Sequence, residues 1–401
     1  MSSMDHLKDI ASKAIDKAAE DLSEISREIW SNPEEGFQEY HAHKILTDYL
    51  EKKGFPVERQ YVIDTGFRAI YGSHSKPNIS ILCEYDSLPD IGHACGHNLI
   101  SEVGIGAALG IKAAIDDARD AGRQLGTLTV VGSPAEEVGG GKIYQINAGT
   151  FNNIDVAMMA HPYHQNVVNV TSTAVQGVTV RYHGKASHAA QFPWVGLNAF
   201  DAVVMAYNSI YVMRQQMKPT WRVHGIISKG GTRPNIIPDE TEMEYYVRTP
   251  KRNELVGLID RMNKCFKAAS QATGCTVDIE WDHQQYENMI SNPTLSKLYQ
   301  GNAESIGVEI STEYQEMAGS TDMGNVCHVV PGIHPMFYIG AKEVVHSKPF
   351  AITAGSVQAQ QYAIQQAKIL AMTAIDVYCQ RHLVEVMRSE LNSQLAAEQE
   401  P

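Results

Sequence analysis

A thiol and two imidazoles fall within five positions of the chain, at His93, Cys95 and His97. Only Gly96 separates Cys95 from His97, so both donors can turn toward one point, either on one face of a strand or in a glycine-bearing loop. Thiolate sulfur and imidazole nitrogen are ligands that a borderline-soft divalent ion such as zinc prefers. A buried cysteine and histidine packed against a turn would give the same pattern. This segment alone leaves both interpretations open.

An adjacent pair of carboxylates, Glu136 and Glu137, precedes a run of three glycines, Gly139 to Gly141. The glycines would allow a ligand to approach the backbone closely. One carboxylate could then bind a metal while the other acts as a general base. A solvated turn is the alternative interpretation for such a pair.

Two further histidines follow apolar stretches that resemble strands. His161 comes after residues 154–160, and His346 follows residues 336–339. Both positions suit a metal ligand at the end of a strand, although a histidine that caps backbone groups is the alternative for His161. Asp86, which follows the apolar residues 79–83, is expected to orient a ligand histidine rather than to bind metal.

The elements that must position these residues alternate between strand and helix. We predict strands at 79–83, 127–131 and 154–160, with a helix at 100–120. This order predicts an α/β fold with a mixed, mostly parallel sheet and helices on its faces. Ligands bind beyond the carboxyl ends of the strands in such sheets, which is where the polar groups fall. The chain is also expected to begin with an amphipathic helix over 1–30.

The middle of the chain has a different pattern. Strands at 173–182, 223–228, 241–248 and 275–281 and helices at 196–217 and 251–273 give the order βαββαβ, which predicts a ferredoxin-like α+β domain. We expect this domain, residues 173–290, to be inserted between the two parts of a catalytic domain, 1–172 and 291–401. The second part is predicted to end in one long amphipathic helix from residue 356 to about residue 395.

Composition excludes several classes of partner. The 401 residues carry a net charge of −13, with 43% hydrophobic and 20% charged residues. This acidic balance argues against a nucleic acid or an anionic membrane surface as partner. No apolar run long enough to span a membrane is expected. The six cysteines show no paired spacing, which indicates reduced thiols and a cytoplasmic location.

Taken together, the motifs resemble the amidohydrolase branch of the aminoacylase/carboxypeptidase family of two-metal peptidases. The resemblance covers nearly the whole chain. It rests on EYDSLP at 84–89, GHACGH at 92–97, PAEE at 134–137, AHP at 160–162, GKASHA at 184–189, GGTRPNIIP at 230–238 and HS at 346–347.

The resemblance implies roles for the residues that match. Two divalent metal ions are expected, zinc before manganese, with Glu136 as the general base. The implied ligands are Cys95, His97, Glu137, His161 and His346.

Residues of the inserted domain also receive implied roles. His188 would reach from one subunit into the partner's active site and support the oxyanion, which implies a homodimer formed through this domain. Asn235 and Arg248 would hold polar groups of the substrate, and an arginine suits bidentate capture of a carboxylate.

The implied reaction is hydrolysis of an amide bond in a small dipeptide. β-Alanyl or γ-aminobutyryl conjugates of lysine, ornithine or arginine are the expected substrates, and aminobenzoyl-glutamate or N-acyl amino acids are the alternatives. A metal-binding scaffold without catalysis is a distant alternative. It is disfavoured because all five ligand positions and the base are filled.

Overall fold

The computed structural model describes residues 3–311 and 319–399 and divides the chain into two compact units. Unit 1 comprises Met1–Thr171 with Met289–Ala397, and unit 2 comprises Ser172–Asn288 with the last four residues. The boundaries predicted after residues 172 and 290 fall one and two residues away from these.

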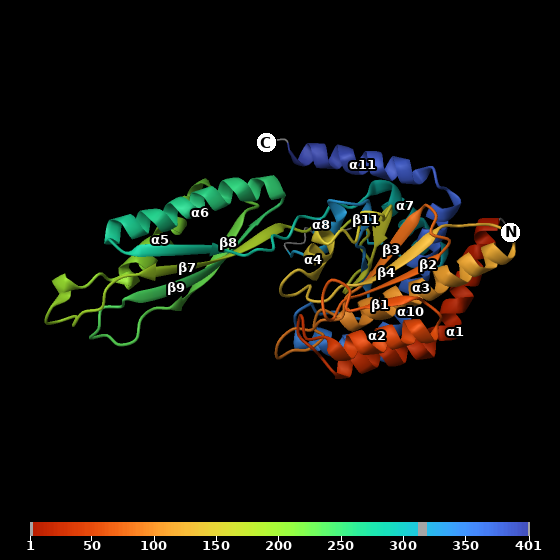
Figure 1. The fold of residues 1–401 in the computed structure, drawn as a ribbon, viewed down its shortest axis with the longest axis horizontal. Coiled ribbons are helices and arrows are strands. Elements are labelled where there is room, and N and C mark those ends of the chain that lie inside the picture. The colour runs from red at the N-terminus through yellow and green to blue at the C-terminus, as the bar shows by residue number, and fades with distance from the viewer. Residues whose placement is uncertain (1–2, 312–318, 400–401) are drawn as a thin grey trace. The chain divides into compact units, whose positions relative to one another are not determined.

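Unit 1 is built on a six-stranded sheet in the order β1-β2-β4-β3-β5-β11 (Figure 1). Four neighbouring strands, β4, β3, β5 and β11, are parallel, whereas β2 runs antiparallel to β4. The prediction of a mixed, mostly parallel sheet is therefore confirmed. The strands are β1 (Val57–Arg59), β2 (Phe67–Gly72), β3 (Asn78–Cys83), β4 (Thr127–Gly132), β5 (Val156–Met158) and β11 (Gly332–Ile333); β6 (His161–Tyr163) and β12 (Met336–Tyr338) form a separate parallel pair.

Side chains of the central strands alternate between two hydrophobic cores, because successive residues of a strand point to opposite faces. Leu128 and Val130 of β4 join the larger core, with helices α1 (Ser3–Ser31), α3 (His97–Asp120) and α10 (Val357–Cys379). Val131 joins a second core with α8 (Met323–Cys327). Both faces of the sheet are thus covered. The other helices of unit 1 are α2 (Tyr40–Lys52), α4 (Gly141–Asn147), α7 (Pro293–Ser305), α9 (Lys348–Ala354) and α11 (Leu383–Glu398).

Helix α3 is long and apolar enough to cross a membrane by length and composition, so the expectation that no apolar run is long enough was wrong. Within unit 1, however, 89% of its most apolar window is buried. It packs between α1, α10 and the sheet, as a core helix does.

Two predicted elements were wrong in extent. The apolar stretch 154–160 forms only the short strand β5, and the chain then enters β6 at His161, which pairs with β12. The long helix predicted over 356–395 is two helices, α10 and α11, because the chain leaves the helical conformation at Gln380. Most of α10 is buried, so it is a core helix rather than an amphipathic surface helix.

Unit 2 has the predicted ferredoxin-like fold. Its antiparallel sheet has the order β10-β7-β9-β8, and its two helices pack on one face of that sheet. On β9, Met243, Tyr245 and Val247 are buried whereas Glu244 and Tyr246 are exposed, as expected for a sheet covered on one side. The elements are β7 (Ala174–His183), α5 (Ala199–Met213), β8 (Arg222–Lys229), β9 (Glu240–Thr249), α6 (Arg252–Thr273) and β10 (Thr276–Trp281).

Candidate metal centre

The predicted site residues of unit 1 meet where its parallel strands end. Asp86 follows β3, Glu136 and Glu137 follow β4, and His161 lies three residues after the end of β5. These neighbouring strands are parallel, so their carboxyl ends share one edge of the sheet. His97, the first residue of α3, enters the same cluster.

Gly96 shapes the turn that brings Cys95 and His97 together. Its φ of +79° is a left-handed conformation that residues with a Cβ rarely adopt. A Cβ at this position would lie only 2.5 Å from Cγ of Pro162. The two donors therefore converge through a loop that ends in the first turn of α3, and not along a strand.

The five predicted ligands form two overlapping groups in which the ligand atoms lie within 4.8 Å of one another. Cys95, His97 and His161 make one group, and Cys95, Glu137 and His346 make the other. The Cys95 sulfur belongs to both groups.

The donor atoms have the arrangement that a metal site would require. Nε2 of His97 is buried, has no hydrogen-bond partner among the described residues, and lies 3.8 Å from Oε1 of Glu137. His161 donates from Nδ1 to the carbonyl oxygen of Pro162 at 2.8 Å, which leaves Nε2 as the ligand atom, 3.3 Å from the Cys95 sulfur. Buried polar atoms without partners are costly, and a divalent cation would satisfy these lone pairs.

Asp86 occupies the supporting position that the sequence predicted. One carboxylate oxygen lies 3.0 Å from Nδ1 of His97, and the other accepts a hydrogen bond from the Glu137 N–H at 2.9 Å. Burial opposes ionisation, but the His97 charge and these hydrogen bonds outweigh it and lower the pKa of Asp86. An ionised Asp86 fixes the ring of His97 with Nε2 toward the cluster.

Glu136 lies in a strongly acidic, buried environment. Burial and the charges of Glu84 and Glu137 raise the pKa of Glu136 well above the usual range of a carboxyl group. Cations bound at the neighbouring ligands would oppose this shift and return Glu136 toward the ionised form that a base requires.

Sequence reasoning missed a buried ion triad beside the cluster. The ammonium of Lys142 contacts Glu84 at 2.5 Å and also contacts Asp322, and none of these three side chains is exposed. Lys142 follows the glycine run, where a Cβ on Gly141 would lie 1.8 Å from the carbonyl oxygen of Pro134. The glycines therefore let α4 approach closely enough to bury the lysine. No spacing in the sequence links these three residues.

Two histidines differ from expectation in their surroundings. His346 is half exposed, with a left-handed φ of +63°, and its Nε2 lies 3.4 Å from Oε1 of Glu137. His334, for which the sequence gave no role, is buried with its ring 5.4 Å from that of His161. His93 bonds to the carbonyl oxygen of Ile29 at 3.1 Å, which fits a supporting role.

Asn98, which the sequence left unexplained, joins elements of unit 1. Its amide donates to Oγ of Ser26 and to the carbonyl oxygen of Ala354, both at 3.0 Å. It thus ties the first turn of α3 to α1 and α9, next to the metal ligands.

The predicted residues of unit 2 fall into two places. His188 and Asn235 lie close together, because His188 pairs with Ile236 and the Ala189 N–H donates to the carbonyl oxygen of Asn235 at 3.1 Å. His188 is exposed, and its Nδ1 accepts backbone N–H groups of Ala190 and Gln191. Arg248 lies apart from these two residues, near the other end of β9. The roles predicted for His188, Asn235 and Arg248 in catalysis and substrate binding stay predictions.

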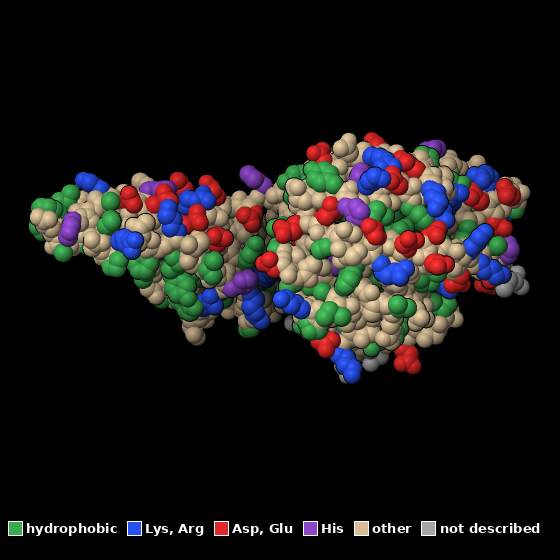
Figure 2. Space-filling model, turned by 90° about the horizontal axis from the view of Figure 1, so that it is seen from below, with side chains coloured by type: hydrophobic (Ala, Val, Ile, Leu, Met, Phe, Trp, Pro, Cys, Tyr) green, Lys and Arg blue, Asp and Glu red, His purple; other side chains and the backbone are tan. Residues whose placement is uncertain are grey.

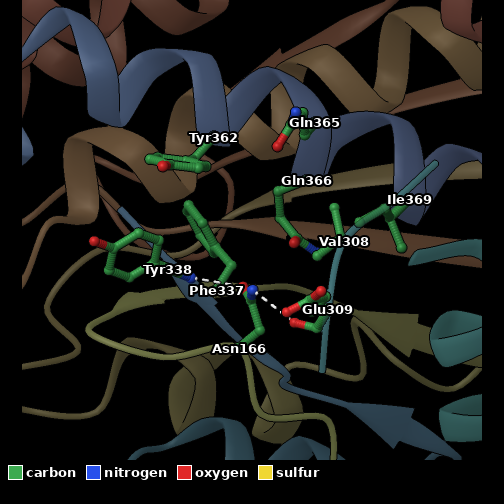
Figure 3. Close-up of a pocket in the computed structure, with 10 residues that line it drawn as sticks. Asn166, Val308, Glu309, Phe337, Tyr338, Tyr362, Gln365, Gln366 and Ile369 are labelled. Carbon is green, nitrogen blue, oxygen red and sulfur yellow. Dashed lines mark hydrogen bonds between the residues drawn. The ribbon is translucent and has the colours of Figure 1, made fainter. Parts of the chain in front are cut away.

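A cavity of about 330 Å³ in unit 1 is lined by none of the predicted site residues (Figure 3). One of its polar side chains, Asn166, is held by backbone groups: its amide donates to the carbonyl oxygen of Glu309, and its Oδ1 accepts from the Tyr338 N–H. Glu309 is its single acidic residue. It therefore offers no ligand set comparable to the cluster at the sheet edge.

Comparison with known proteins agrees with this geometry. Residues 172–273 match the model of a peptidase dimerisation domain of the M20 type. Xaa-Arg dipeptidases of Homo sapiens and Mus musculus are 46% and 48% identical to the chain, cover 99% and 98% of it, and match over 95% and 94% of their own lengths. The chain belongs to the M20 peptidase family.

A solved structure shows the same fold. A dinuclear metal binding peptidase of the M20 family from Bacillus subtilis matches with a TM-score of 0.70 at 20% identity, covering 90% of this chain and 99% of its own. The predictions of a peptidase enzyme and of its fold class are thereby confirmed. The finer expectation of β-alanyl-lysine as substrate stays a prediction.

Proposed function

We propose that this M20 peptidase is a two-metal dipeptidase that hydrolyses dipeptides with a C-terminal basic residue. The observation that carries the proposal is the pair of ligand groups sharing Cys95, with Glu136 beside Glu137. The solved relative from Bacillus subtilis is described as dinuclear, which supports two cations.

Divalent cations held by Cys95, His97, Glu137, His161 and His346 would polarise the scissile carbonyl and lower the pKa of the attacking water. Zinc suits a site with a thiolate, and manganese accepts the imidazole and carboxylate ligands. Glu136 takes the proton of the water during attack and delivers it to the departing amine nitrogen. Such positioned proton transfer contributes about 10²–10⁴-fold to the rate.

The variant Glu136→Gln tests this role, because it keeps the shape of the side chain and removes the base. We expect kcat to fall by about 10²-fold or more while the metal content, measured by elemental analysis, stays at two per chain. Near-normal turnover with both metals bound would refute the assignment. Loss of metal in the variant would instead make Glu136 a ligand.

The substrate class is proposed from the relatives, which are named Xaa-Arg dipeptidases. Among such substrates we favour β-alanyl or γ-aminobutyryl conjugates of lysine, ornithine or arginine. A panel of these dipeptides, an aminobenzoyl-glutamate and an N-acetyl amino acid, each assayed with zinc and with manganese, separates the alternatives. Cleavage of only the acidic or acylated compounds would refute the proposal.

A homodimer through unit 2 completes the proposal. His188 pairs with Ile236, just before β9 begins, whereas Arg248 lies near the far end of β9, and the eight steps from Glu240 to Arg248 span about 26 Å at 3.2–3.4 Å per residue. One copy cannot bring both side chains to one small substrate. We therefore propose that His188 of one copy and Arg248 of another serve the same site, with Asn235 beside His188.

The surface of unit 2 supports association. Its edge strand β8 is exposed along nearly its whole length, and α5 exposes several large hydrophobic side chains. Figure 2 shows hydrophobic side chains gathered on one part of the protein surface. Val212 of α5 is 76% exposed and Ile226 of β8 is 62% exposed. We expect Ile226→Asp to yield monomers in sedimentation with greatly reduced activity. A fully active monomer would refute the shared site.

We also propose a cytoplasmic location, supported by six cysteines that are all free. Titration of the thiols in protein extracted with a thiol-blocking reagent tests this location. Oxidised cysteines in the native protein would contradict it. The alternative of a metal-binding scaffold without catalysis would be supported if the wild-type protein bound two metals and cleaved no member of the dipeptide panel.

A further inference from the structure

The residue before the proposed base has an unusual backbone. Ala135 has a φ of +59°, the left-handed conformation that costs about 1–2 kcal/mol for a residue with a Cβ. Such strain persists only where surrounding contacts hold it. Its carbonyl oxygen accepts the Gly140 N–H at 2.9 Å, and Gly36 packs so closely that a Cβ there would lie 3.1 Å from Ala135.

The N–H of Ala135 is held by a buried carboxylate from a distant part of the chain. It donates to Oε1 of Glu39 at 2.8 Å, and the other oxygen of Glu39 accepts from the Thr65 hydroxyl at 2.7 Å. Glu39 is completely buried and has no cationic partner among the described residues. Burial accordingly raises the pKa of Glu39 to about 7.

Glu39 precedes α2, yet its side chain does not cap that helix. Glu34 performs this task instead, because its carboxylate accepts the N–H groups of His41 and Ala42 at 2.9–3.0 Å. The Glu39 carboxylate is thereby left for Ala135. A buried carboxylate without a cation is expensive to maintain, so its placement calls for a role other than stability.

We propose that Glu39 is a positioning residue for the reaction. By holding the left-handed Ala135, it fixes the direction in which the chain presents Glu136 and Glu137. This inference rests on the proposed function, in which Glu136 is the base and Glu137 a ligand. A displacement of about 1 Å at a catalytic group can cost about 10²-fold in rate.

The variant Glu39→Ala removes the acceptor and is compared with two others. Glu39→Gln keeps an oxygen for the Ala135 N–H and can donate its amide to the Thr65 hydroxyl. Thr65→Val is the matched control, because it removes the other hydrogen bond of the same carboxylate and leaves the bond to Ala135. Assays at pH 8 keep Glu39 ionised in the wild type.

With saturating metal and two metals bound, we expect Glu39→Ala to lower kcat about 10- to 100-fold with KM within about twofold of wild type. Its zinc affinity, measured by competition with a chromophoric chelator, should fall because Glu137 is also displaced. Glu39→Gln should keep kcat within about threefold of wild type. Thr65→Val should lower the melting temperature without a comparable loss of kcat or zinc affinity.

Two results would overturn the inference. One is a Glu39→Ala enzyme whose kcat and zinc affinity match those of Thr65→Val, and the other is a Glu39→Gln enzyme as impaired as Glu39→Ala. If Glu39→Ala is insoluble, Glu39→Asp replaces it, since the shorter side chain cannot hold both partners; unchanged kcat and affinity would then overturn the inference. Wild-type protein that hydrolyses no dipeptide refutes the proposed function instead, and zinc affinity alone then decides for Glu39.

Discussion

Replacing Lys142 by methionine should destabilise unit 1 strongly. The lysine ammonium contacts Glu84 and Asp322, and all three side chains are fully buried. Methionine has a similar volume but leaves two buried carboxylates without a cation. Breaking a buried ion pair in this way costs about 3–5 kcal/mol, far more than an exposed pair is worth. We expect a loss of that size in the free energy of unfolding at pH 8.

The loss should depend on pH in a defined direction. Asp322 is buried, and its pKa lies at about 6 even beside Lys142. Without the lysine the pKa of Asp322 rises further. The Asp322 carboxyl of the folded variant therefore stays protonated to a higher pH than it does in the unfolded chain. The variant therefore loses stability as pH rises through that pKa, and its deficit relative to wild type is smaller at pH 5 than at pH 8.

Urea denaturation of chelator-treated protein measures the effect, and hydrogen exchange in β3 and α4 separates unit 1 from unit 2. The triple variant Lys142→Met, Glu84→Gln, Asp322→Asn is the control. Buried ionic groups replaced together can be nearly neutral, so it should recover most of the loss. A single variant within about 1 kcal/mol of wild type at pH 8, or a triple variant no more stable than the single one, would refute the reasoning.

Two further substitutions test the site and the core. Gly96→Ala should weaken zinc binding at least about tenfold in a chelator competition, because Gly96 has a φ of +79° and a Cβ would meet Pro162. Gly122→Ala is the control and should bind zinc normally, because Gly122 has a similar φ of +73° but a Cβ there would meet nothing within 4 Å. Equal affinities would contradict the role given to the turn. Burial raises the pKa of Glu102 to about 8. The contribution of Glu102 to the free energy of unfolding is therefore fully present below about pH 4.5 and is lost as the pH rises to 8. Glu102→Gln should therefore exceed wild type by up to about 4 kcal/mol in unfolding free energy at pH 9 and match it near pH 4.5; a constant difference between these pH values would refute this.

Much of the fold follows from local patterns in the sequence. Strands β3 and β4 and all elements of unit 2 were predicted within a few residues; β3 and β4 are short, continuous apolar runs, and β7 and β9 alternate between buried and less buried positions. The break between α10 and α11 was missed, since Gln380 carries no helix-stopping signal such as glycine or proline. The shortness of β5 was missed because the apolar stretch continues beyond it.

The candidate site was predictable where each residue follows a strand. Cys95, His97, Glu137, His161 and His346 meet as expected. Glu137 and His161 do so because they follow neighbouring parallel strands, whereas Cys95 and His97 join them through the turn before α3. The residues that support them were not predictable in the same way. Lys142 and Glu39 act through partners far away in the chain, and only the packing of unit 1 reveals those contacts.

The buried carboxylates around the ligand cluster explain why the site needs supporting residues as well as metal ligands. Glu84, Asp86, Glu136, Glu137 and Asp322 are five buried or nearly buried carboxylates at one edge of a sheet. Such a concentration of negative charge cannot remain ionised in a low-dielectric interior without compensating cations. Lys142 supplies one positive charge permanently and pairs with two of these carboxylates, Glu84 and Asp322. The other three, Asp86, Glu136 and Glu137, each lie within 4.0 Å of a ring nitrogen of His97, and Glu137 also faces His346, so compensation of their negative charge falls to these histidines and any bound cations.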